Sequence, residues 1–245
     1  MTATQDHRIM TYSILARDPG TGAFGAAVAS RFFAVGATCL RVEGGVAVLS
    51  TQALVNPLYG IEAMPILRTG ADPQTVLDAL VNPDPGRAQR QFHILDGKGR
   101  IAQHTGEACV TWAGHVRGTD VSVAGNMLAG PAVVERTLEA FVAARGTVAE
   151  RLLDAMEAGE AAGGDRRGKQ SAALLVCTRD PYPDLDIRAD DHPDPLVELR
   201  RLYRISLERF AVFRRLLAGA DSRWGVHDRA VINAIIEREA SKPGE

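Results

Sequence analysis

The sequence predicts an α+β protein in which two packed antiparallel sheets are covered by helices on both outer faces. Predicted strands occur in blocks that alternate with pairs of helices, whereas a doubly wound sheet would alternate single strands with single helices. The first strands are small, β-branched and apolar on both sides, which is typical of strands covered on two faces. No linker is long enough to divide the chain into separate domains. We therefore expect a four-layer αββα sandwich.

Turn and cap residues separate the predicted elements. Asp18–Gly22, with one proline and two glycines, joins the first two strands, and residues 96–99 join a later pair. Asp72 precedes a proline at the start of one helix, and Gly146 and Gly159 close two others. The predicted strands are residues 11–17, 23–30, 37–42, 46–52, 90–95, 100–104, 121–127, 171–177 and 184–189. The predicted helices are residues 58–68, 73–80, 131–144, 148–158, 196–217 and 228–239.

The composition is that of a soluble globular protein. The chain has 245 residues, of which 46% are hydrophobic and 24% charged, so it can bury a sizeable core. The net charge of −2 gives no reason to expect nucleic acid or an anionic membrane as a partner. Cys39, Cys109 and Cys177 are widely spaced and form neither a disulfide framework nor a metal-binding pair. With no signal peptide and no apolar run of membrane length, a cytoplasmic protein is expected.

Residues 20–25, Gly-Thr-Gly-Ala-Phe-Gly, match the GxGxxG pattern of dinucleotide-binding proteins. In such proteins the strand runs directly into the first glycine, and a helix begins at the last one. Here Asp18 and Pro19 come before the first glycine, and small apolar residues follow the last one as in a second strand. We therefore interpret the motif as a hairpin turn and expect no nucleotide cofactor. No cofactor is predicted from the rest of the sequence either.

Thr11 opens the first predicted strand, and Met10 directly precedes it. A β-branched residue at a strand start is common, so the residues alone favour an ordinary structural role. Residues 1–10 show no pattern and are interpreted as an N-terminal extension. Residues 11–218 form the predicted domain, and residues 219–245 form a helical C-terminal tail.

Seven segments of the chain together resemble one protein family. They run from Thr11 to about Tyr203 and read TYSILARDPGTGAFGAAVASRFFAVGA, LSTQALVNPLYG, RQFHILDGKGRIAQHTG, WAGH, GNMLAG, AGGDRRGKQSAALLV and DDHPDPLVELRRL. On these segments the chain is identified as a member of domain-of-unknown-function family 1028, which is assigned to the N-terminal nucleophile (Ntn) hydrolase superfamily. The resemblance implies an Ntn-hydrolase-like sandwich, in agreement with the pattern of strands and helices.

The resemblance also implies a catalytic role for Thr11. In this superfamily the nucleophile is the first residue of the mature chain, and its own α-amine acts as the general base. Family members commonly begin Met-Thr-Phe-Ser, and Met10-Thr11-Tyr12-Ser13 matches that start. Either the working protein begins at Met10, or the extension is real. In the second case Thr11 must be freed by cleavage, or it never offers an amine.

Further active-site candidates follow from their places in this resemblance. Arg31 lies roughly where the superfamily keeps a lysine beside the nucleophile, and a cation there would lower the pKa of the amine. A surface salt bridge is the alternative role for Arg31. The strand end formed by Ser50, Thr51 and Gln52 is where the class supplies backbone N–H groups to an oxyanion. The side-chain amide of Asn126 is a second candidate donor, with loop shaping as its alternative.

The glycine-rich loop of residues 163–170 carries more charge than a connection needs. Its glycines allow the backbone to approach a ligand, and its cations can hold a carboxylate or a phosphate. The alternative is a solvated loop whose arginines pair with Asp190 and Asp191. The predicted substrate-binding residues are Ser30, Gln52, Asp165, Arg166, Arg167, Lys169 and Gln170.

Residues 190–194, Asp-Asp-His-Pro-Asp, have the side chains of a hard-cation or zinc site. Neighbouring side chains of an extended segment point to opposite faces, so these groups cannot share one ion without a tight turn. A polar turn in which Asp194 caps the following helix is the better explanation. No metal site is predicted.

The sequence therefore predicts an amide (C–N) bond hydrolase that uses Thr11 on a small amide or short peptide. The alternative is a non-catalytic ligand-binding or scaffold protein of the same fold, which a blocked Thr11 amine would favour. The arginine-rich helix at residues 196–217 and the apolar residues of the tail favour a homo-oligomer, although the same surfaces can also pack within the chain.

Overall fold

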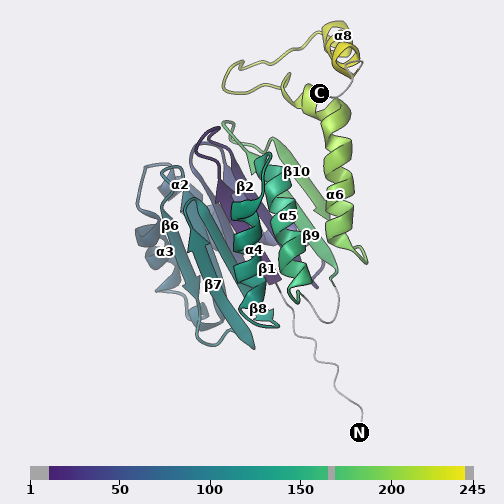
Figure 1. Ribbon diagram of the computed structural model, residues 1–245. Helices are drawn as coiled ribbons and strands as arrows, with labels where there is room; N and C mark the ends of the chain where they lie inside the picture. The colour runs from purple at the N-terminus through teal and green to yellow at the C-terminus, as the bar shows by residue number, and fades with distance from the viewer. Residues whose placement is uncertain (1–10, 165–168, 241–245) are drawn as a thin grey trace.

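The structure, a computed structural model, describes residues 11–164 and 169–240 (Figure 1). The predicted extension, residues 1–10, and the predicted substrate-binding residues Asp165, Arg166 and Arg167 lie outside the described residues. Within the described part, no helix has both the length and the apolar character needed to cross a membrane.

Two antiparallel sheets form the centre of the molecule. The strands of sheet A, in spatial order, are β10 (Leu185–Ala189), β9 (Ser171–Cys177), β2 (Phe24–Ser30), β1 (Thr11–Arg17), β8 (Val121–Leu128) and β7 (Trp112–Gly118). The strands of sheet B, in spatial order, are β3 (Leu40–Glu43), β4 (Ala47–Ala53), β5 (Arg90–Asp96) and β6 (Ile101–Thr105). The strand that begins with Thr11 is therefore an inner strand of sheet A.

Helices cover the outer face of each sheet and complete four layers (Figure 1). Sheet A is covered by α4 (Ala132–Ala143), α5 (Val148–Ala161) and α6 (Pro195–Ile205), and sheet B by α2 (Pro57–Leu67) and α3 (Pro73–Val81). The predicted four-layer αββα sandwich is confirmed, and it is consistent with an Ntn-hydrolase-like fold. The other helical segments are α1 (Val35–Cys39), the 3-10 turn Arg87–Gln89, the π-helical segment Ser206–Phe210, α7 (Ala211–Arg214) and α8 (Arg229–Ala240).

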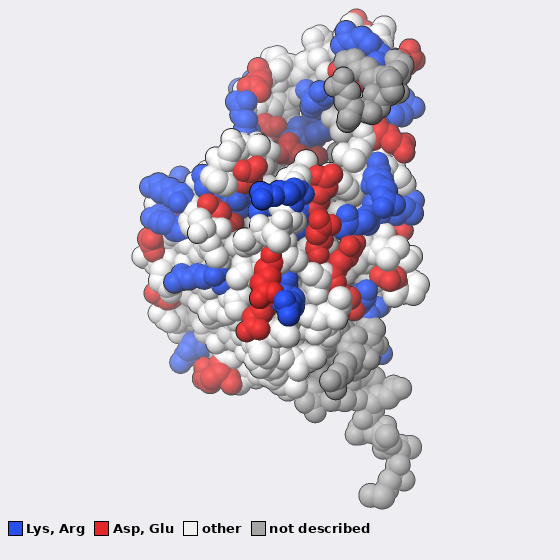
Figure 2. All heavy atoms as spheres, viewed as in Figure 1, with Lys and Arg blue, Asp and Glu red and all other residues white. Residues whose placement is uncertain are grey.

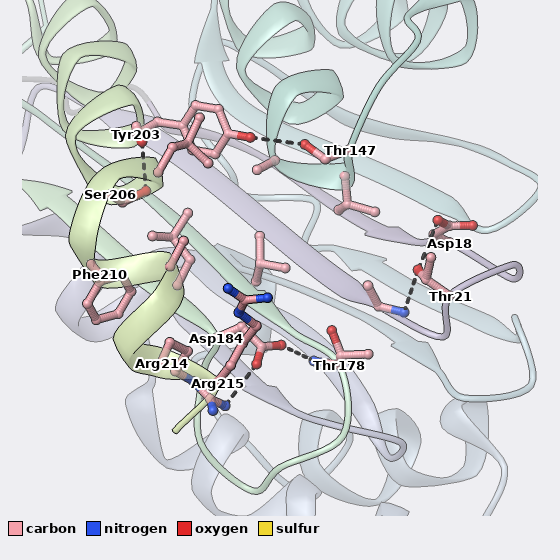
Figure 3. A pocket seen from close by; sticks show the side chains of 17 residues that line it. Asp18, Thr21, Thr147, Thr178, Asp184, Tyr203, Ser206, Phe210, Arg214 and Arg215 are labelled. Atoms are coloured by element: carbon pink, nitrogen blue, oxygen red, sulfur yellow. Dashed lines mark hydrogen bonds and ion pairs between the residues drawn. The ribbon is translucent and has the colours of Figure 1, made fainter. Parts of the chain in front are cut away.

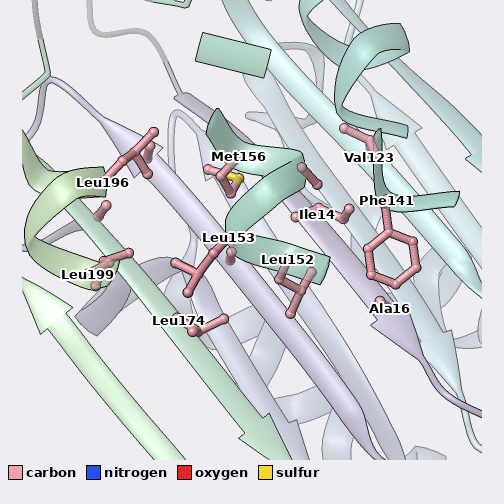
Figure 4. Close-up of a cluster of buried hydrophobic side chains, with 14 of the residues drawn as sticks. Ile14, Ala16, Val123, Phe141, Leu152, Leu153, Met156, Leu174, Leu196 and Leu199 are labelled. Carbon is pink, nitrogen blue, oxygen red and sulfur yellow. The ribbon is translucent and has the colours of Figure 1, made fainter. Parts of the chain in front are cut away.

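Apolar side chains fill the spaces between each sheet and its helices. Ile14, Leu152 and Met156 belong to the core between sheet A and α4, α5 and α6 (Figure 4). Between sheet B and its helices, the rings of Tyr59 and Phe92 pack with their centroids 5.2 Å apart. Burying one large aliphatic or aromatic side chain contributes roughly 1.5–3 kcal/mol, so these two cores hold the helices on the sheets.

The third space, between the two sheets, is apolar in one half and polar in the other. Leu15, Phe24 and Leu95 belong to an apolar cluster in this space. Toward the end where β1 begins, the buried side chains between the sheets are polar instead, and they include Thr11 and Ser13. This polar half contains the candidate site described below.

One prediction at the edge of a sheet is wrong, and one edge strand is not predicted. Residues 37–42 form the end of α1 and most of β3 rather than one strand. Ala34 has a left-handed φ of 52°, and a Cβ atom on Gly36 would lie 2.1 Å from the Ala173 Cβ, so the chain turns tightly against sheet A before β3. No strand is predicted at residues 112–118, where β7 lies. β7 is an edge strand in which no residue is fully buried, so its apolar pattern is weak.

The predicted continuous helix at residues 196–217 is also corrected. α6 ends at Ile205, the π-helical segment follows, and α7 ends at Arg214. Ser206 Oγ donates a hydrogen bond of 2.7 Å to the Tyr203 carbonyl, so a side chain competes with the regular helical hydrogen bonds at the break.

The C-terminal tail contains the helix predicted at residues 228–239, which is confirmed as α8. α8 packs on α7 and the π-helical segment, and its Ile236 is buried. Trp224 and Val231 are exposed. Part of the apolar surface of the tail therefore packs within the chain, and the homo-oligomer stays a prediction.

The face formed by α4, α5 and α6 has both signs of charge. Figure 2 shows acidic and basic side chains interspersed over this face. Arg200 of α6 pairs with Asp154 and Glu157 of α5, each at 2.7 Å. These exposed pairs join neighbouring helices, and each is worth at most about 1 kcal/mol.

Candidate active site

A row of four polar side chains crosses sheet A where β1 begins. Thr11 lies opposite Asn126 of β8 on one side and Ser30 of β2 on the other. Ser30 in turn lies opposite Ser171 of β9, and each of the four residues is at most 5% exposed. Side chains alternate along a strand, and Leu15, four residues after Thr11, belongs to the cluster between the sheets. The row therefore faces sheet B.

The hydroxyl of Thr11 is held by its neighbour in this row. Thr11 Oγ1 and Ser30 Oγ are 3.0 Å apart, within hydrogen-bond distance. Ser30 Oγ also accepts a hydrogen bond of 3.2 Å from the Phe32 N–H. Ser171 Oγ accepts from the Val35 N–H at 3.0 Å and donates to the Phe32 carbonyl. The segment that leaves β2 is thus tied to the row, which gives the Thr11 hydroxyl a fixed place.

Three amide side chains link the row to sheet B. Gln91 Oε1, on β5, accepts hydrogen bonds from Asn126 Nδ2 at 2.9 Å and from Gln52 Nε2 at 3.0 Å. Gln91 Nε2 donates to the Gly125 carbonyl at 2.8 Å. These bonds fix the orientation of each amide, because exchanging its oxygen and nitrogen would set donor against donor. Asn126 Nδ2 carries a second N–H hydrogen, the kind of group that stabilises an oxyanion.

A hydrogen-bonded chain through a buried histidine continues from these amides. Ser13 Oγ donates to Gln52 Oε1 at 2.6 Å, so it can only accept from His93 Nε2, which is 2.9 Å away. The ring proton of His93 therefore resides on Nε2. His93 Nδ1 then accepts from Ser122 Oγ at 2.7 Å, and Ser122 Oγ accepts from Gln103 Nε2 at 2.9 Å.

The surroundings of His93 keep it neutral. Burial, and to a smaller extent the charge of His115, lower the pKa of His93 to about 3. One ring nitrogen donates a hydrogen bond and the other accepts one, which only the neutral ring can do. His93 is therefore a structural link between the sheets near neutral pH.

The three residues predicted at the end of β4 point to two different faces of sheet B: Ser50 and Gln52 face sheet A, and Thr51 faces away from it. Ser50 Oγ lies 3.5 Å from Gln52 Oε1, and both residues belong to the buried polar network that faces sheet A. Thr51 points the other way, and its hydroxyl accepts from the Asn56 N–H at 3.4 Å. The side chain of Thr51 is therefore on the opposite face of β4 from Thr11, and only its backbone is available for the predicted oxyanion role.

Arg31 directly follows Ser30, the residue that lies opposite Thr11 on β2. Its side chain is exposed, and within the described part of the chain no hydrogen bond or ion pair joins it to Thr11. A cation must lie within about 4–6 Å of an amine to lower its pKa substantially in water-accessible protein. The role of Arg31 beside the nucleophile therefore stays a prediction, with a surface salt bridge as its alternative.

Lys169 and Gln170 lie beside the row, at the start of β9. The Gln170 N–H donates to the Ser30 carbonyl at 2.9 Å. Lys169 Nζ lies 3.1 Å from Asp194 Oδ1 and 3.6 Å from Glu160 Oε1, so its charge is already balanced. Asp194 caps α6, as the sequence predicts. Among the residues that the structure describes, no three acidic, histidine or cysteine side chains gather as a metal site requires.

The predicted site does not include Ser13, Gln91, His93 or Ser122, which the structure adds to the polar network. The feature of the sequence that could have identified them is their position: each is a polar residue inside a strand whose other residues are mostly apolar. Thr11 and Ser13, like Gln91 and His93, are two positions apart and therefore share one face of their strand. Two such pairs on facing strands indicate a polar layer between the sheets.

Comparison with known proteins places this site in a family. The model of DUF1028, a family of unknown function, matches residues 11–199. The crystal structure of protein SPO2555 from Silicibacter pomeroyi, assigned to the same family model, is 34% identical. That match covers 90% of this chain and 96% of that one, with a TM-score of 0.84. Anbu (ancestral beta-subunit) from Yersinia bercovieri is 11% identical over 80% of this chain and 94% of its own, with a TM-score of 0.36.

Curated proteins gave no match to this sequence. The family match begins at Thr11, the first residue of β1 and a member of the buried polar row. It ends within α6, so it includes both sheets and every residue of the hydrogen-bonded network described above. The chain belongs to DUF1028, a family of unknown function.

Proposed function

We propose that this protein is an amide hydrolase of the N-terminal nucleophile class, with Thr11 as nucleophile and a small amide or short peptide as substrate. The observation that supports this most directly is the place of Thr11. It is the first residue of an inner strand in a four-layer αββα sandwich, and its hydroxyl lies in a buried polar row beside Ser30 and Asn126. The family match also begins at this residue.

The proposed reaction uses one residue as both nucleophile and base. The α-amine of Thr11 takes the proton of Oγ1, and Oγ1 attacks the carbonyl carbon of the substrate amide. The free N–H of Asn126 and a backbone N–H of β4 stabilise the oxyanion. The protonated amine passes its proton to the leaving nitrogen as the C–N bond breaks, which leaves an ester on Oγ1. Water, activated by the same amine, hydrolyses this ester and releases the carboxylic acid.

A substrate carboxylate is proposed to bind near the start of β9. Gln170 is hydrogen-bonded to the backbone of Ser30, so this segment adjoins the polar row. Lys169 pairs with Glu160 and with the half-exposed Asp194, so a substrate carboxylate would bind Lys169 by displacing Asp194. Substrates that carry a carboxylate close to the scissile amide are therefore the first to test.

The mechanism requires that Thr11 be the first residue. In the chain as translated from Met1, the Thr11 nitrogen is part of the peptide bond to Met10 and cannot act as a base. A chain that starts at Met10 exposes the amine once the initiator methionine is removed. We expect only the chain that begins at Thr11 to release amine from a panel of carboxylate-bearing amides and dipeptides.

This expectation is tested by comparing the full chain with a chain expressed from Met10. Intact mass confirms each N-terminus, because removal of the initiator methionine exposes Thr2 in the full chain and Thr11 in the shorter one. The rate of the shorter chain should rise with pH up to about 8, since an α-amine titrates at about 7.7–8.0. Equal activity of the two chains would contradict the proposal, and inactivity of both would favour a ligand-binding or scaffold role.

A further inference from the structure

A hollow lies beside Asp18, at the opposite end of β1 from Thr11. Figure 3 shows the side chains that line it. It is a cavity of about 420 Å³ between the β1–β2 turn, the start of α5, strands β9 and β10, and the helical segment from Tyr203 to Arg215. Asp18 at its edge directly follows β1, whereas Thr11 begins that strand. Seven residues of strand separate the two sites by about 20 Å.

The wall of this cavity is mainly apolar. It includes Val148 of α5, Val176 of β9 and Leu185 of β10 on the side of the sheet. On the other side Leu207 and Phe210 of the π-helical segment line it, although both side chains remain substantially exposed. Large apolar side chains around a hollow of this size are typical of small-molecule sites. π-Helical turns also occur frequently at functional sites.

The polar side chains of the wall already have partners inside the protein. The Tyr203 hydroxyl lies 3.2 Å from Thr147 Oγ1. Asp184 pairs with Arg214 at 2.8 Å and accepts from the Thr178 N–H at 2.6 Å. These groups gain nothing from a polar ligand, so the body of a ligand in this cavity must be apolar.

The two acidic groups at the rim are also accounted for. Asp18 accepts hydrogen bonds of 2.9 Å from the Gly20 N–H and from the Thr21 hydroxyl. These bonds lower its pKa, so it stays a carboxylate. Asp184 and Asp180 share the guanidinium of Arg214, at 2.8 and 3.0 Å. Both acids lie at the rim and already have hydrogen-bonding partners, so neither needs a ligand group.

Arg215 lies at the rim and can donate further hydrogen bonds to a ligand. Its side chain is 62% exposed, and its Nη2 pairs with Glu239 of α8. A guanidinium has five N–H donors, so a single carboxylate does not exhaust it. Figure 3 shows Arg214 and Arg215 together at one end of the cavity, across from Asp18 and Thr21. A second carboxylate can therefore bind Arg215 while the group attached to it enters the cavity.

We propose that this cavity binds a small carboxylic acid with an apolar body, such as a medium-chain or aromatic carboxylate. The chain or ring lies against Val176, Leu185 and Phe210, and the carboxylate pairs with Arg215. This site is separate from Thr11, and the proposal does not depend on the proposed hydrolase activity.

Titration calorimetry of the full chain with decanoate and decanol, each below its aggregation threshold, tests the proposal. Decanoate should bind with one-to-one stoichiometry and about tenfold more tightly than decanol, because only the acid pairs with Arg215. Arg215→Ala should remove that difference. Arg209→Ala is the matched control, since Arg209 is an exposed arginine of the same segment that does not line the cavity.

Two further variants test the cavity itself. Ala211→Phe should fill it and weaken both ligands at least tenfold, and Leu207→Ala should weaken both by removing part of the wall. Circular dichroism shows whether each variant is folded, and Leu207→Ala serves if Ala211→Phe is not. The proposal is overturned if decanoate does not saturate the protein, if the folded cavity variants bind normally, or if Arg215→Ala behaves like Arg209→Ala.

Discussion

Replacing Thr11 by alanine, in a chain that begins at residue 11, is expected to lower kcat/KM for amide hydrolysis by at least about a thousandfold. The variant keeps a free α-amine but has no Oγ1, so the base has no nucleophile to activate. Loss of the 3.0 Å contact with Ser30 removes only one hydrogen bond, worth about 1 kcal/mol, and the fold should remain. Initial rates on the best amide of the panel measure the effect.

Two matched variants separate chemistry from folding. Thr11→Ser keeps both the hydroxyl and the amine and should retain activity within about tenfold. Thr75→Ala removes the same atoms from an exposed position on α3 and should change nothing. If Thr11→Ala keeps the rate of the parent chain, Thr11 is not the nucleophile. Loss of activity in Thr75→Ala as well would show that the assay reports stability.

Acid is expected to destabilise the fold through His93. The pKa of His93 is about 3 in the folded protein, against the ordinary value of 6.5 in the unfolded chain. The unfolded state therefore binds a proton that the folded state does not, and stability falls as pH drops from about 6.5 toward 3. Between pH 7 and pH 4 this one residue should remove about 3 kcal/mol from the free energy of unfolding.

Urea unfolding at both pH values, in the parent chain and in His93→Gln, isolates this contribution. Glutamine can still donate to Ser13 Oγ but does not titrate. The loss between pH 7 and pH 4 should therefore be about 3 kcal/mol smaller in the variant, even though the variant is less stable at pH 7. Carboxylates such as Asp18 and Asp180 also have lowered pKa values, and they affect both chains equally. Parallel pH profiles would show that His93 is not a buried neutral link.

The layers of the fold could be predicted because they depend on local signals. Asp72 and Asp194 begin helices as N-caps, and the turn at residues 96–99 closes a hairpin, all as the sequence indicates. The α1 turn could not be predicted in this way. Its conformation depends on the contact of Gly36 with Ala173, a residue far away in the sequence. β7 could not be predicted either, because this edge strand has no fully buried residue and its apolar pattern is weak.

The candidate site could be predicted only in part, because much of it depends on contacts between residues far apart in the sequence. Thr11 and Asn126 were found through family resemblance, and the structure places them side by side. Gln91 and His93 act through contacts between the two sheets, and a pattern within one strand does not say which residues it will face. Arg31 follows β2 and is exposed, and its role beside the nucleophile stays a prediction.

The central claim is that Thr11 acts with a free amine, so the most direct test is the N-terminus of the protein purified from its native cells. Intact mass and terminal peptide sequencing measure it. Our account predicts a chain that begins at Thr11, whether by initiation at Met10 or by cleavage of the extension. A mature chain that still carries residues before Thr11 would lock the amine in a peptide bond and contradict the proposed mechanism.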